Sequence, residues 1–446
     1  MNREAILAAV EKHRETILAA EAYIFGNPET GYREEKTSRY MEERFRALGY
    51  EVTMAEGIPG FYTVVDTGKE GPEVLVLGEL DSIICPSHPT ADPETGAAHS
   101  CGHNAQCAAL LGVAAALRDP KVLEGLCGRI RLCAVPAEEL LEIEYRTALR
   151  DVGKIKYFGG KSEFLRRGYF DGVNLALMVH TSTTSYFSTI AGNIGCIAKK
   201  ITYKGVSAHA GASPWEGKNA LYAATAGINA CNALRECFRE EDIIRFHPIM
   251  TSGGSMVNAI PERAVLESYV RGKTFAAIEA ANRRLNGALC GAALSLGVNV
   301  EIEDSPGYAP MVNDEKMNAL AGKVLKEIYA DEEFRASSAY SSGSTDMGDL
   351  SCVLPALHAY APGAEGRSHG NDYRIVDPER ACVKSAVWQV GMICALLENG
   401  GATALDIMKN HKPLFESFEA FLAYQDSLSS CGDRIVYEGE EARVRL

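Results

Sequence analysis

Residues 72–81 read PEVLVLGELD, an apolar run that begins after a proline and ends in acidic residues. Its continuous apolar character is typical of a strand buried on both faces, as in a parallel sheet. Similar runs occur at 61–68, at 129–139 (RIRLCAVPAEE) and at 174–181 (NLALMVHT), and an apolar helix that begins near His103 falls between two of them. Strands that alternate with helices in this way predict an α/β domain with a largely parallel sheet.

The pattern changes after about residue 190. Between residues 191 and 304 the strand-like and helix-like segments follow the order β-α-β-β-α-β, which is the ferredoxin-like arrangement. Beyond this region, helices and a strand of the first style return. We therefore predict one α/β domain formed by residues 1–190 and 305–446, with a smaller α+β domain of residues 191–304 inserted in it.

Length, charge and cysteine content limit the class of protein. A chain of 446 residues is expected to form two domains, and its net charge of −14 with a pI near 5.3 argues against nucleic acid or an anionic membrane as partner. A small-molecule partner is favoured. The thirteen cysteines are scattered and odd in number, no secretory signal precedes them, and no run of eighteen apolar residues occurs. These features predict reduced thiols in a cytoplasmic protein without a membrane span.

Side chains that can bind metals or protons stand at the ends of the predicted strands and before the apolar helix. The carboxyl ends of strands in one parallel sheet face one crevice, so these side chains are expected to converge. His99, Cys101 and His103 occupy alternate positions, and on an extended segment such side chains point the same way. Taken singly, each of them is as easily explained by a structural role. The side chains are Asp81, His99, Cys101, His103, Glu138, Glu139, His180 and His369.

Glu138 and Glu139 carry the clearest chemical signal. Two adjacent carboxylates after a buried strand repel each other unless a cation or a proton separates their roles. One of them can bind a metal ion, while the other takes a proton from water near that ion and passes it to a leaving nitrogen. The pair therefore indicates metal-dependent hydrolysis.

Several motifs, in this order, resemble the M20 metallopeptidase family. They include HSCGHNAQCAALLG from His99, AVPAEE before Leu140, GVSAHAGASPWEGKNAL around His209, GGSMVNAIPERAVLESYVRG around Asn258, and RSHG at His369. The similarity covers nearly the whole chain. Within the family the chain looks like subfamily D, the amidohydrolase branch that includes aminoacylases, hippurate hydrolases and aminobenzoyl-glutamate hydrolases.

The resemblance implies a centre of two divalent metal ions, manganese or zinc, with a cysteine where other branches place a bridging aspartate. It implies that Glu138 is the general base and that Asp81 orients a metal-ligating imidazole. A thiolate bridge is chemically reasonable, because metal ions depress the pKa of a thiol strongly. The implied ligands are Cys101, His103, Glu139, His180 and His369.

The inserted domain acquires a role from the same resemblance. In the family it is a lid and a dimerisation module, so a homodimer is expected. The histidine that matches His209 reaches the active site of the other subunit and stabilises the tetrahedral intermediate. Asn258 matches a residue near the substrate, where its amide can donate to an oxyanion or a carboxylate. Arg271 is a candidate for binding a substrate carboxylate, with a surface salt bridge as the alternative.

Three departures from the branch stand out. Asn104 and Gln106 replace the Asp and His that often follow the metal histidine, and DSIICP from Asp81 replaces the usual DALP, which changes a wall of the site. The segment Leu140–Asp171 is longer than the branch usually carries. Either it covers the pocket or its basic and aromatic residues decorate a helix pair. If it covers the pocket, deletion of residues Lys156–Phe164 should change substrate preference and leave the metal content intact.

These observations predict a metal-dependent amidohydrolase that cleaves an N-acyl amino acid or an aminobenzoyl-glutamate-like substrate. Two alternatives stay open. A dipeptidase or carboxypeptidase of the same family would use the same centre, and preference for a free α-amino group would identify a dipeptidase. A catalytically silent, metal-containing binding protein is the other, and the presence of all five implied ligands and the base argues against it.

Overall fold

The computed structural model describes residues 1–439 and 441–446, which fall into two compact units. The first unit comprises Met1–Gly192, Met311–Ser341 and Thr345–Glu419, and the second comprises Asn193–Pro310, Ser342–Ser344 and Ala420–Leu446. The C-terminal boundary differs from the one drawn on the sequence, which assigned all of residues 305–446 to the first domain. Strand β21 (Ser430–Asp433) pairs with β14 (Asn299–Pro306), so the last part of the chain belongs with the second unit.

A mixed sheet of eight strands organises the first unit, in the order β1-β2-β6-β3-β7-β18-β8-β16. Its central strands β6, β3, β7 and β18 run parallel, and every residue of β3 is buried. This is the largely parallel sheet predicted from the sequence. The strands are β1 (Thr53–Met54), β2 (Phe61–Asp66), β3 (Glu73–Glu79), β6 (Arg129–Val135), β7 (Leu175–Ser182), β8 (Phe187–Thr189), β16 (Phe334–Ala336) and β18 (Ala356–Pro362). The short strands β4 (Ile83–Ile84) and β5 (Ala97–Ala98), β19 (Ala364–Glu365) and β20 (Arg374–Ile375), and β15 (Met311–Val312), β9 (Gly192–Asn193) and β17 (Tyr340–Ser341) form small separate sheets.

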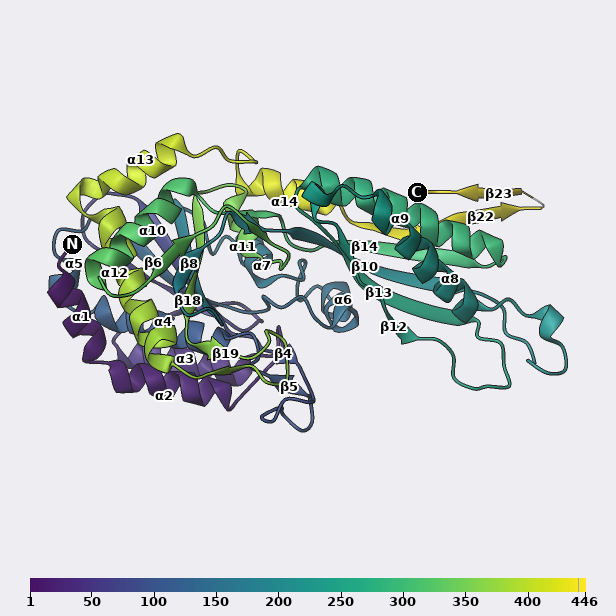
Figure 1. Cartoon of the computed structure of the whole chain (residues 1–446), viewed down its shortest axis with the longest axis horizontal. Coiled ribbons are helices and arrows are strands. Elements are labelled where there is room, and N and C mark those ends of the chain that lie inside the picture. The colour runs from purple at the N-terminus through teal and green to yellow at the C-terminus, as the bar shows by residue number, and fades with distance from the viewer. Residues whose placement is uncertain (440) are drawn as a thin grey trace. The chain divides into compact units, whose positions relative to one another are not determined.

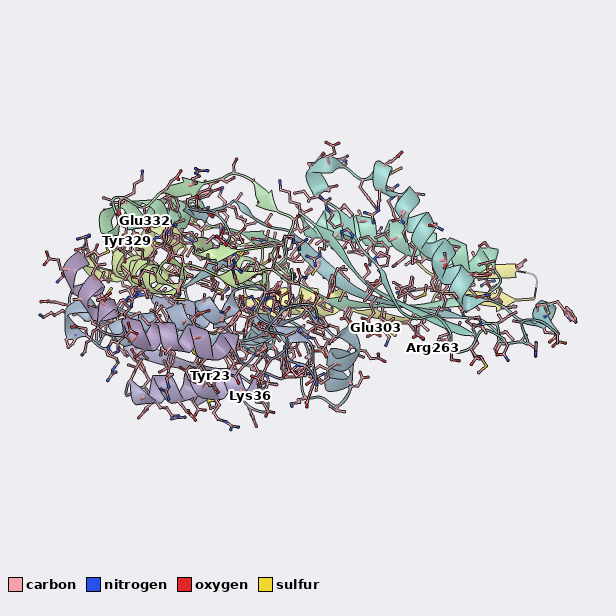
Figure 2. The ribbon with its side chains drawn as sticks, turned by 60° about the horizontal axis from the view of Figure 1, so that its bottom comes forward. Tyr23, Lys36, Arg263, Glu303, Tyr329 and Glu332 are labelled. Carbon is pink, nitrogen blue, oxygen red and sulfur yellow. The ribbon has the colours of Figure 1, made fainter. Side chains whose placement is uncertain are left out.

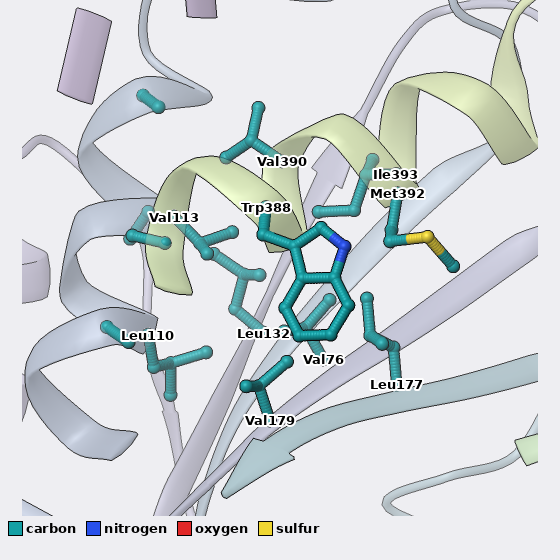
Figure 3. Close-up of a cluster of buried hydrophobic side chains, with 14 of the residues drawn as sticks. Val76, Leu110, Val113, Leu132, Leu177, Val179, Trp388, Val390, Met392 and Ile393 are labelled. Carbon is teal, nitrogen blue, oxygen red and sulfur yellow. The ribbon is translucent and has the colours of Figure 1, made fainter. Parts of the chain in front are cut away.

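Helix α4 (His103–Ala116) lies at the centre of this unit's core, with all of its residues buried. It contacts β3, α2 and α12. Figure 3 shows Trp388 of α12 packed near Val76 of β3 and Leu177 of β7, and the Trp388 indole N–H donates to the carbonyl oxygen of Ala321 at 2.9 Å. The other helices are α1 (Arg3–Glu11), α2 (Arg14–Phe25), α3 (Glu35–Ala47), α5 (Pro120–Leu123), α6 (Ile143–Asp151), α7 (Gly160–Arg166), α10 (Glu315–Ile328), α11 (Met347–Ser351), η4 (Glu379–Lys384), α12 (Ser385–Leu397), η5 (Asn399–Gly401) and α13 (Ala402–Asn410).

Polar and aromatic contacts join the outer helices of the first unit to one another. Tyr23 of α2 stacks on Tyr40 of α3, with ring centroids 3.9 Å apart. Glu332, which follows α10, forms ion pairs with Arg380 and Lys384 at 2.6 and 2.7 Å. Tyr23 and Glu332 are labelled in Figure 2.

The second unit has the predicted β-α-β-β-α-β order, formed by β10, α8, β12, β13, α9 and β14. Its antiparallel sheet has the order β11-β13-β10-β14-β21, with β12 also paired to β13. Helices α8 and α9 pack on this sheet (Figure 1), and Ile201, Leu266 and Leu289 are fully buried in its core. The remaining bounds are β10 (Gly195–Lys204), η1 (Pro214–Glu216), α8 (Ala220–Ala233), η2 (Arg235–Cys237), η3 (Glu240–Asp242), β11 (Arg245–Phe246), β12 (Ile249–Ser252), β13 (Arg263–Gly272), α9 (Phe275–Ser295), α14 (Phe418–Ser427), β22 (Ile435–Glu438) and β23 (Glu441–Val444).

One helical stretch, Glu379–Leu397, is long and apolar enough to cross a membrane by length and composition alone. Of its most apolar window, 83% is buried inside the structure. Its α12 portion packs against α4 and α10 in the first unit. A helix that is apolar on all sides also forms the core of a large domain, and we interpret Glu379–Leu397 as a core helix.

Candidate metal centre

Four parts of the first unit bring the candidate ligands together. Three of them are the start of α4, the end of β7 and the loop after β6, and the fourth is the loop between β19 and β20. The backbone N–H of His369 donates to Ser100 O at 2.8 Å, which joins the last loop to the segment before α4. These parts supply Cys101 just before α4 and His103 at its start, Glu138 and Glu139 after β6, His180 in β7, and His369 between β19 and β20.

Cys101, His103 and His180 form the first donor group. One donor atom from each lies within 4.8 Å of the other two, and Cys101 Sγ is 3.4 Å from His180 Nε2. A sulfur and a nitrogen bound to one tetrahedral zinc ion are about 3.6 Å apart, given bond lengths of about 2.3 and 2.1 Å. The spacing therefore fits two ligands of one ion.

Cys101, Glu139 and His369 form the second donor group. His369 Nε2 lies 2.9 Å from Glu139 Oε1. Cys101 belongs to both groups. The structure thus brings together all five residues that the resemblance implied as ligands.

Backbone and carboxylate acceptors orient the imidazoles of His103 and His180. His103 Nδ1 lies 2.9 Å from Asp81 O and 3.3 Å from Asp81 Oδ1, and His180 Nδ1 lies 2.7 Å from Thr181 O. A carbonyl oxygen only accepts, so each Nδ1 carries the proton and each Nε2 is left for a metal ion. Asp81 Oδ2 also accepts from the Glu139 N–H at 2.8 Å, so Asp81 positions a residue of each donor group.

The residues present fit a metal ion on two counts. The close polar neighbours of two buried atoms, His103 Nε2 and Glu139 Oε1, are themselves donor-group atoms, Glu79 Oε2 at 3.3 Å and His369 Nε2 at 2.9 Å, and such clustered nitrogen and oxygen atoms are suited to bind a metal ion. The donor set of one thiol, imidazoles and a carboxylate is also the chemistry that zinc and related ions take.

The charges of these buried groups depend strongly on one another. Burial and the Glu139 carboxylate act to raise the pKa of the Cys101 thiol, but His103 and His180 outweigh them and lower it to about 6. Burial likewise opposes ionisation of Glu139, yet His369 lowers its pKa to about 2. Burial, with the charges of Glu79 and Glu139, holds the pKa of Glu138 well above its ordinary value. Clusters with such opposed shifts are typical of functional sites.

Glu79 is a member of the site that the sequence analysis missed. It forms a third donor group with His103 and Glu138, and Glu79 Oε2 lies 3.3 Å from His103 Nε2. Glu79 is the last residue of a strand that is buried throughout, and the sequence analysis names only Asp81, two residues further on, at this strand end. A carboxylate inside an otherwise apolar strand was the signal available, because such groups are rarely buried without a partner.

His99 does not join any of the donor groups formed by the described residues. The expected alternation fails because the chain does not stay extended: Ser100 N–H donates to Ala98 O at 3.0 Å, and Gly102 is left-handed with φ of 100°. The His99 ring is buried, and burial lowers its pKa to about 3.

Backbone conformation at the site is unusual in three places. Gly102 separates Cys101 from His103, and a Cβ there would lie 2.5 Å from the Tyr373 hydroxyl. Ala137, before Glu138, has φ of 57°, and His369 has φ of 61°. Non-glycine residues in the left-handed region cost about 1–3 kcal/mol each and cluster at functional sites.

The segment between Glu139 and β7 forms a helix pair, α6 and α7, and several of its basic and aromatic side chains are buried although others are exposed. Arg146, Tyr157 and Lys161 are buried. Arg146 donates to Glu139 O, and Lys161 Nζ lies 2.6 Å from Glu79. Residues 156–164 thus include a side chain in contact with a donor group, and the effect of their deletion on substrate preference and metal content stays a prediction.

His209 and Asn258 lie close together in the second unit. His209 pairs with Ala259 in a β-bridge, and Ala210 N–H donates to Asn258 O at 2.9 Å. The loop that carries His209 leaves the sheet beside the start of β13. Arg271 lies near the other end of that strand. Its guanidinium donates to Ser344 Oγ at 3.3 Å, so within this unit the structure does not join Arg271 to the other two residues.

An α/β domain in which two donor groups share a thiol, beside a buried glutamate, has the features of a metal-dependent hydrolase. The family model described as Peptidase family M20/M25/M40 matches residues 76–393, and the chain belongs to this family. The resemblance seen in the motifs is thereby confirmed. The protein is a metal-dependent hydrolase that acts on amide or peptide bonds.

Individual relatives differ in what they cleave. The chain is 27% identical over 390 residues to the Xaa-Arg dipeptidase of Mus musculus, in a match that covers 82% of this chain and 80% of that protein. It is 28% identical over 306 residues to one of the subunits of the p-aminobenzoyl-glutamate hydrolase of Escherichia coli (strain K12), in a match that covers 66% of this chain and 58% of that protein. A crystal structure of a dinuclear metal binding peptidase of the M20 family from Bacillus subtilis superimposes with a TM-score of 0.62 at 16% identity, covering 87% of this chain and 99% of that one.

Proposed function

We propose that the protein hydrolyses the amide bond of an N-acyl amino acid or an aminobenzoyl-glutamate-like substrate at a centre of two divalent metal ions. The observation that carries this proposal is the position of Cys101, whose sulfur belongs to both donor groups. We assign one ion to Cys101, His103 and His180, and the other to Cys101, Glu139 and His369. A thiolate with a lowered pKa is suited to bridge two cations.

Zinc or manganese is the proposed metal. Zinc accepts thiolate, imidazole and carboxylate together, and manganese accepts imidazole and carboxylate. Bound divalent ions of this kind polarise a carbonyl oxygen and lower the pKa of water toward neutrality.

Glu138 is the proposed general base. Its Oε2 lies 3.8 Å from His103 Nε2, beside the donor groups and outside both of the groups that contain Cys101. The carboxylate takes a proton from the attacking water and passes it to the leaving nitrogen, so the products are a carboxylic acid and an amine. Asp81 keeps His103 and the Glu139 backbone in place during this transfer.

His209 is the proposed oxyanion donor, supplied by a second copy of the chain in a homodimer formed through the inserted domain. Its Nδ1 accepts from the N–H groups of Gly211 and Ala212 at 3.1 and 3.0 Å. The neutral ring therefore carries its proton on Nε2, and the side chain is exposed. An exposed imidazole with a fixed Nε2–H can donate to a developing oxyanion. Asn258, beside it, and Arg271 are proposed to bind substrate.

A dipeptidase is the second candidate. It is favoured by a relative that matches most of both chains, the mouse Xaa-Arg dipeptidase. The same proposed centre serves either reaction. In both substrates the nitrogen of the cleaved amide belongs to an amino acid that carries a carboxylate. A catalytically silent binding protein is the least favoured interpretation.

The proposed partners are small amide substrates and a second copy of the chain, with neither nucleic acid nor membrane. The net charge of −14 supports this. A cytoplasmic location is proposed as well, since the thirteen cysteines are scattered and odd in number, as is typical of reduced thiols, and eleven of them are buried.

The test is an activity screen of metal-reconstituted protein against N-acyl amino acids, aminobenzoyl-glutamate and dipeptides, with Glu138→Gln as the matched inactive control. Hydrolysis of acylated substrates in preference to free dipeptides supports the first candidate, and the reverse order supports the dipeptidase. Two bound metal ions without hydrolysis of any of these amides would contradict both.

A further inference from the structure

A set of buried charged side chains lies next to His103 and has no part in the mechanism proposed above. Glu79, Lys161 and Asp346 are each no more than 1% exposed. Lys161 Nζ lies 2.6 Å from Glu79 Oε1 and contacts Asp346 Oδ1, and the Lys161 backbone N–H donates to Asp346 Oδ2 at 3.0 Å. One cation thus stands between two carboxylates away from solvent. Breaking such an arrangement is costly, because it leaves a buried charge without compensation.

Gln106 holds Glu79 from its other side. The amide Nε2 donates to Glu79 Oε2 at 2.9 Å, and the amide Oε1 accepts from the Glu79 N–H at 3.3 Å. These two hydrogen bonds explain the presence of Gln106, which replaces the residue common in the amidohydrolase branch. The same Oε2 lies 3.3 Å from His103 Nε2, the nitrogen left for a metal ion. Both oxygens of Glu79 are therefore held in place. The carboxylate faces His103, a proposed ligand, and Glu138, which belongs to the same donor group.

We propose that Lys161 and Gln106 are positioning residues for the metal centre, which hold the Glu79 carboxylate against His103 and Glu138. The inference rests on the proposed function, since it takes His103 as a ligand and Glu138 as the base. Partners that lie behind metal ligands fix the ligand geometry, and their loss commonly lowers metal affinity or activity by about 10- to 100-fold. Lys161 and Asp346 come from α7 and the start of α11, so the proposal also explains why the segment after Glu139 is built into the core.

The experiment compares four variants of the full-length protein: Glu79→Gln, Lys161→Met, the double variant, and Gln106→Leu. The readouts are the affinity of the metal-free protein for Zn²⁺, measured against a chromogenic chelator, and kcat with KM of the reloaded protein. Lys199→Met is the control. Lys199 is the other fully buried lysine that forms an ion pair among the described residues, with Asp304 in the second unit, so its loss should lower thermal stability and leave zinc affinity unchanged.

We expect zinc affinity and kcat to fall about 10- to 100-fold in each single variant, with little change in KM. The double variant should be no worse than Lys161→Met, because Lys161 acts through Glu79. Gln106→Leu separates positioning from charge, since it changes no charge. Additive losses in the double variant, or tighter zinc binding in Lys161→Met, would overturn the proposal, as would an unaffected Gln106→Leu.

If Lys161→Met does not fold, the near-isosteric Glu79→Gln and Gln106→Leu carry the test alone. The parent protein distinguishes this inference from the proposed function. A parent that binds fewer than two zinc ions contradicts the proposed centre, whereas a parent with two ions and variants of equal affinity contradicts only the positioning role.

Discussion

Substitution of Cys101 tests whether its thiolate bridges two metal ions or binds only one. Each of the two proposed metal sites has three protein ligands, and Cys101 is the one they share. Zinc gains about 10–16 kcal/mol from roughly four protein ligands, so one ligand is worth about 3 kcal/mol, or about 100-fold in affinity. Cys101→Ala should therefore lower the affinity for both ions about 100-fold, whereas His369→Ala should lower the affinity for only one.

The assay is metal content by mass spectrometry after dialysis against a graded chelator. We expect Cys101→Ala to lose both ions over the same range of chelator concentration. In that range His369→Ala should lose one ion and keep the other. Cys101→Asp should keep both, because a carboxylate can also bridge two cations. The control is Cys394→Ala, which removes a buried thiol of α12 that lies 3.9 Å from Val122 O. The bridge would be refuted if Cys101→Ala lost only one ion, or if Cys394→Ala lost metal to the same extent.

Three further outcomes are expected. Glu138→Gln should keep its metal ions and lose turnover about 100-fold or more, as removal of a general base does; near-parental turnover would show that another group is the base. An equimolar, co-refolded mixture of His209→Ala and Glu138→Gln chains should recover about a quarter of parental activity, because half of the sites in mixed dimers are intact; no recovery would place His209 outside the partner's site. Gly112→Ala should lower the free energy of unfolding by about 1–3 kcal/mol, measured by urea titration, because its Cβ would lie 2.8 Å from both Ala386 and Ile17; an unchanged stability would mean that α2 and α12 move apart easily.

The sheet, and the convergence of candidate ligands at its edge, could be predicted because their signals are local. Apolar runs such as residues 72–81 mark buried strands, and the ends of parallel strands meet at one edge, so His180 and Glu139 could be expected to converge. Cys101 and His103 could be chosen over His99 only through the resemblance to a family, because the turn at Gly102 breaks the alternation.

The support behind the ligands could not be predicted in the same way. Lys161 lies 82 residues from Glu79 and 185 from Asp346 along the chain, and no local pattern indicates that these charges meet. A lysine in a polar segment is usually exposed, so the sequence favoured a surface role. The assignment of residues 420–446 failed for a related reason: β21 is a four-residue strand whose partner, β14, is distant in the sequence.

The central claim is that one sulfur ligates both metal ions, and X-ray absorption at the zinc edge of the two-zinc protein tests it directly. We expect a zinc–sulfur distance of about 2.3 Å at an average of one sulfur per zinc ion, lost in Cys101→Ala and replaced by oxygen in Cys101→Asp. A spectrum with only nitrogen and oxygen ligands while Cys101 is intact would contradict the account.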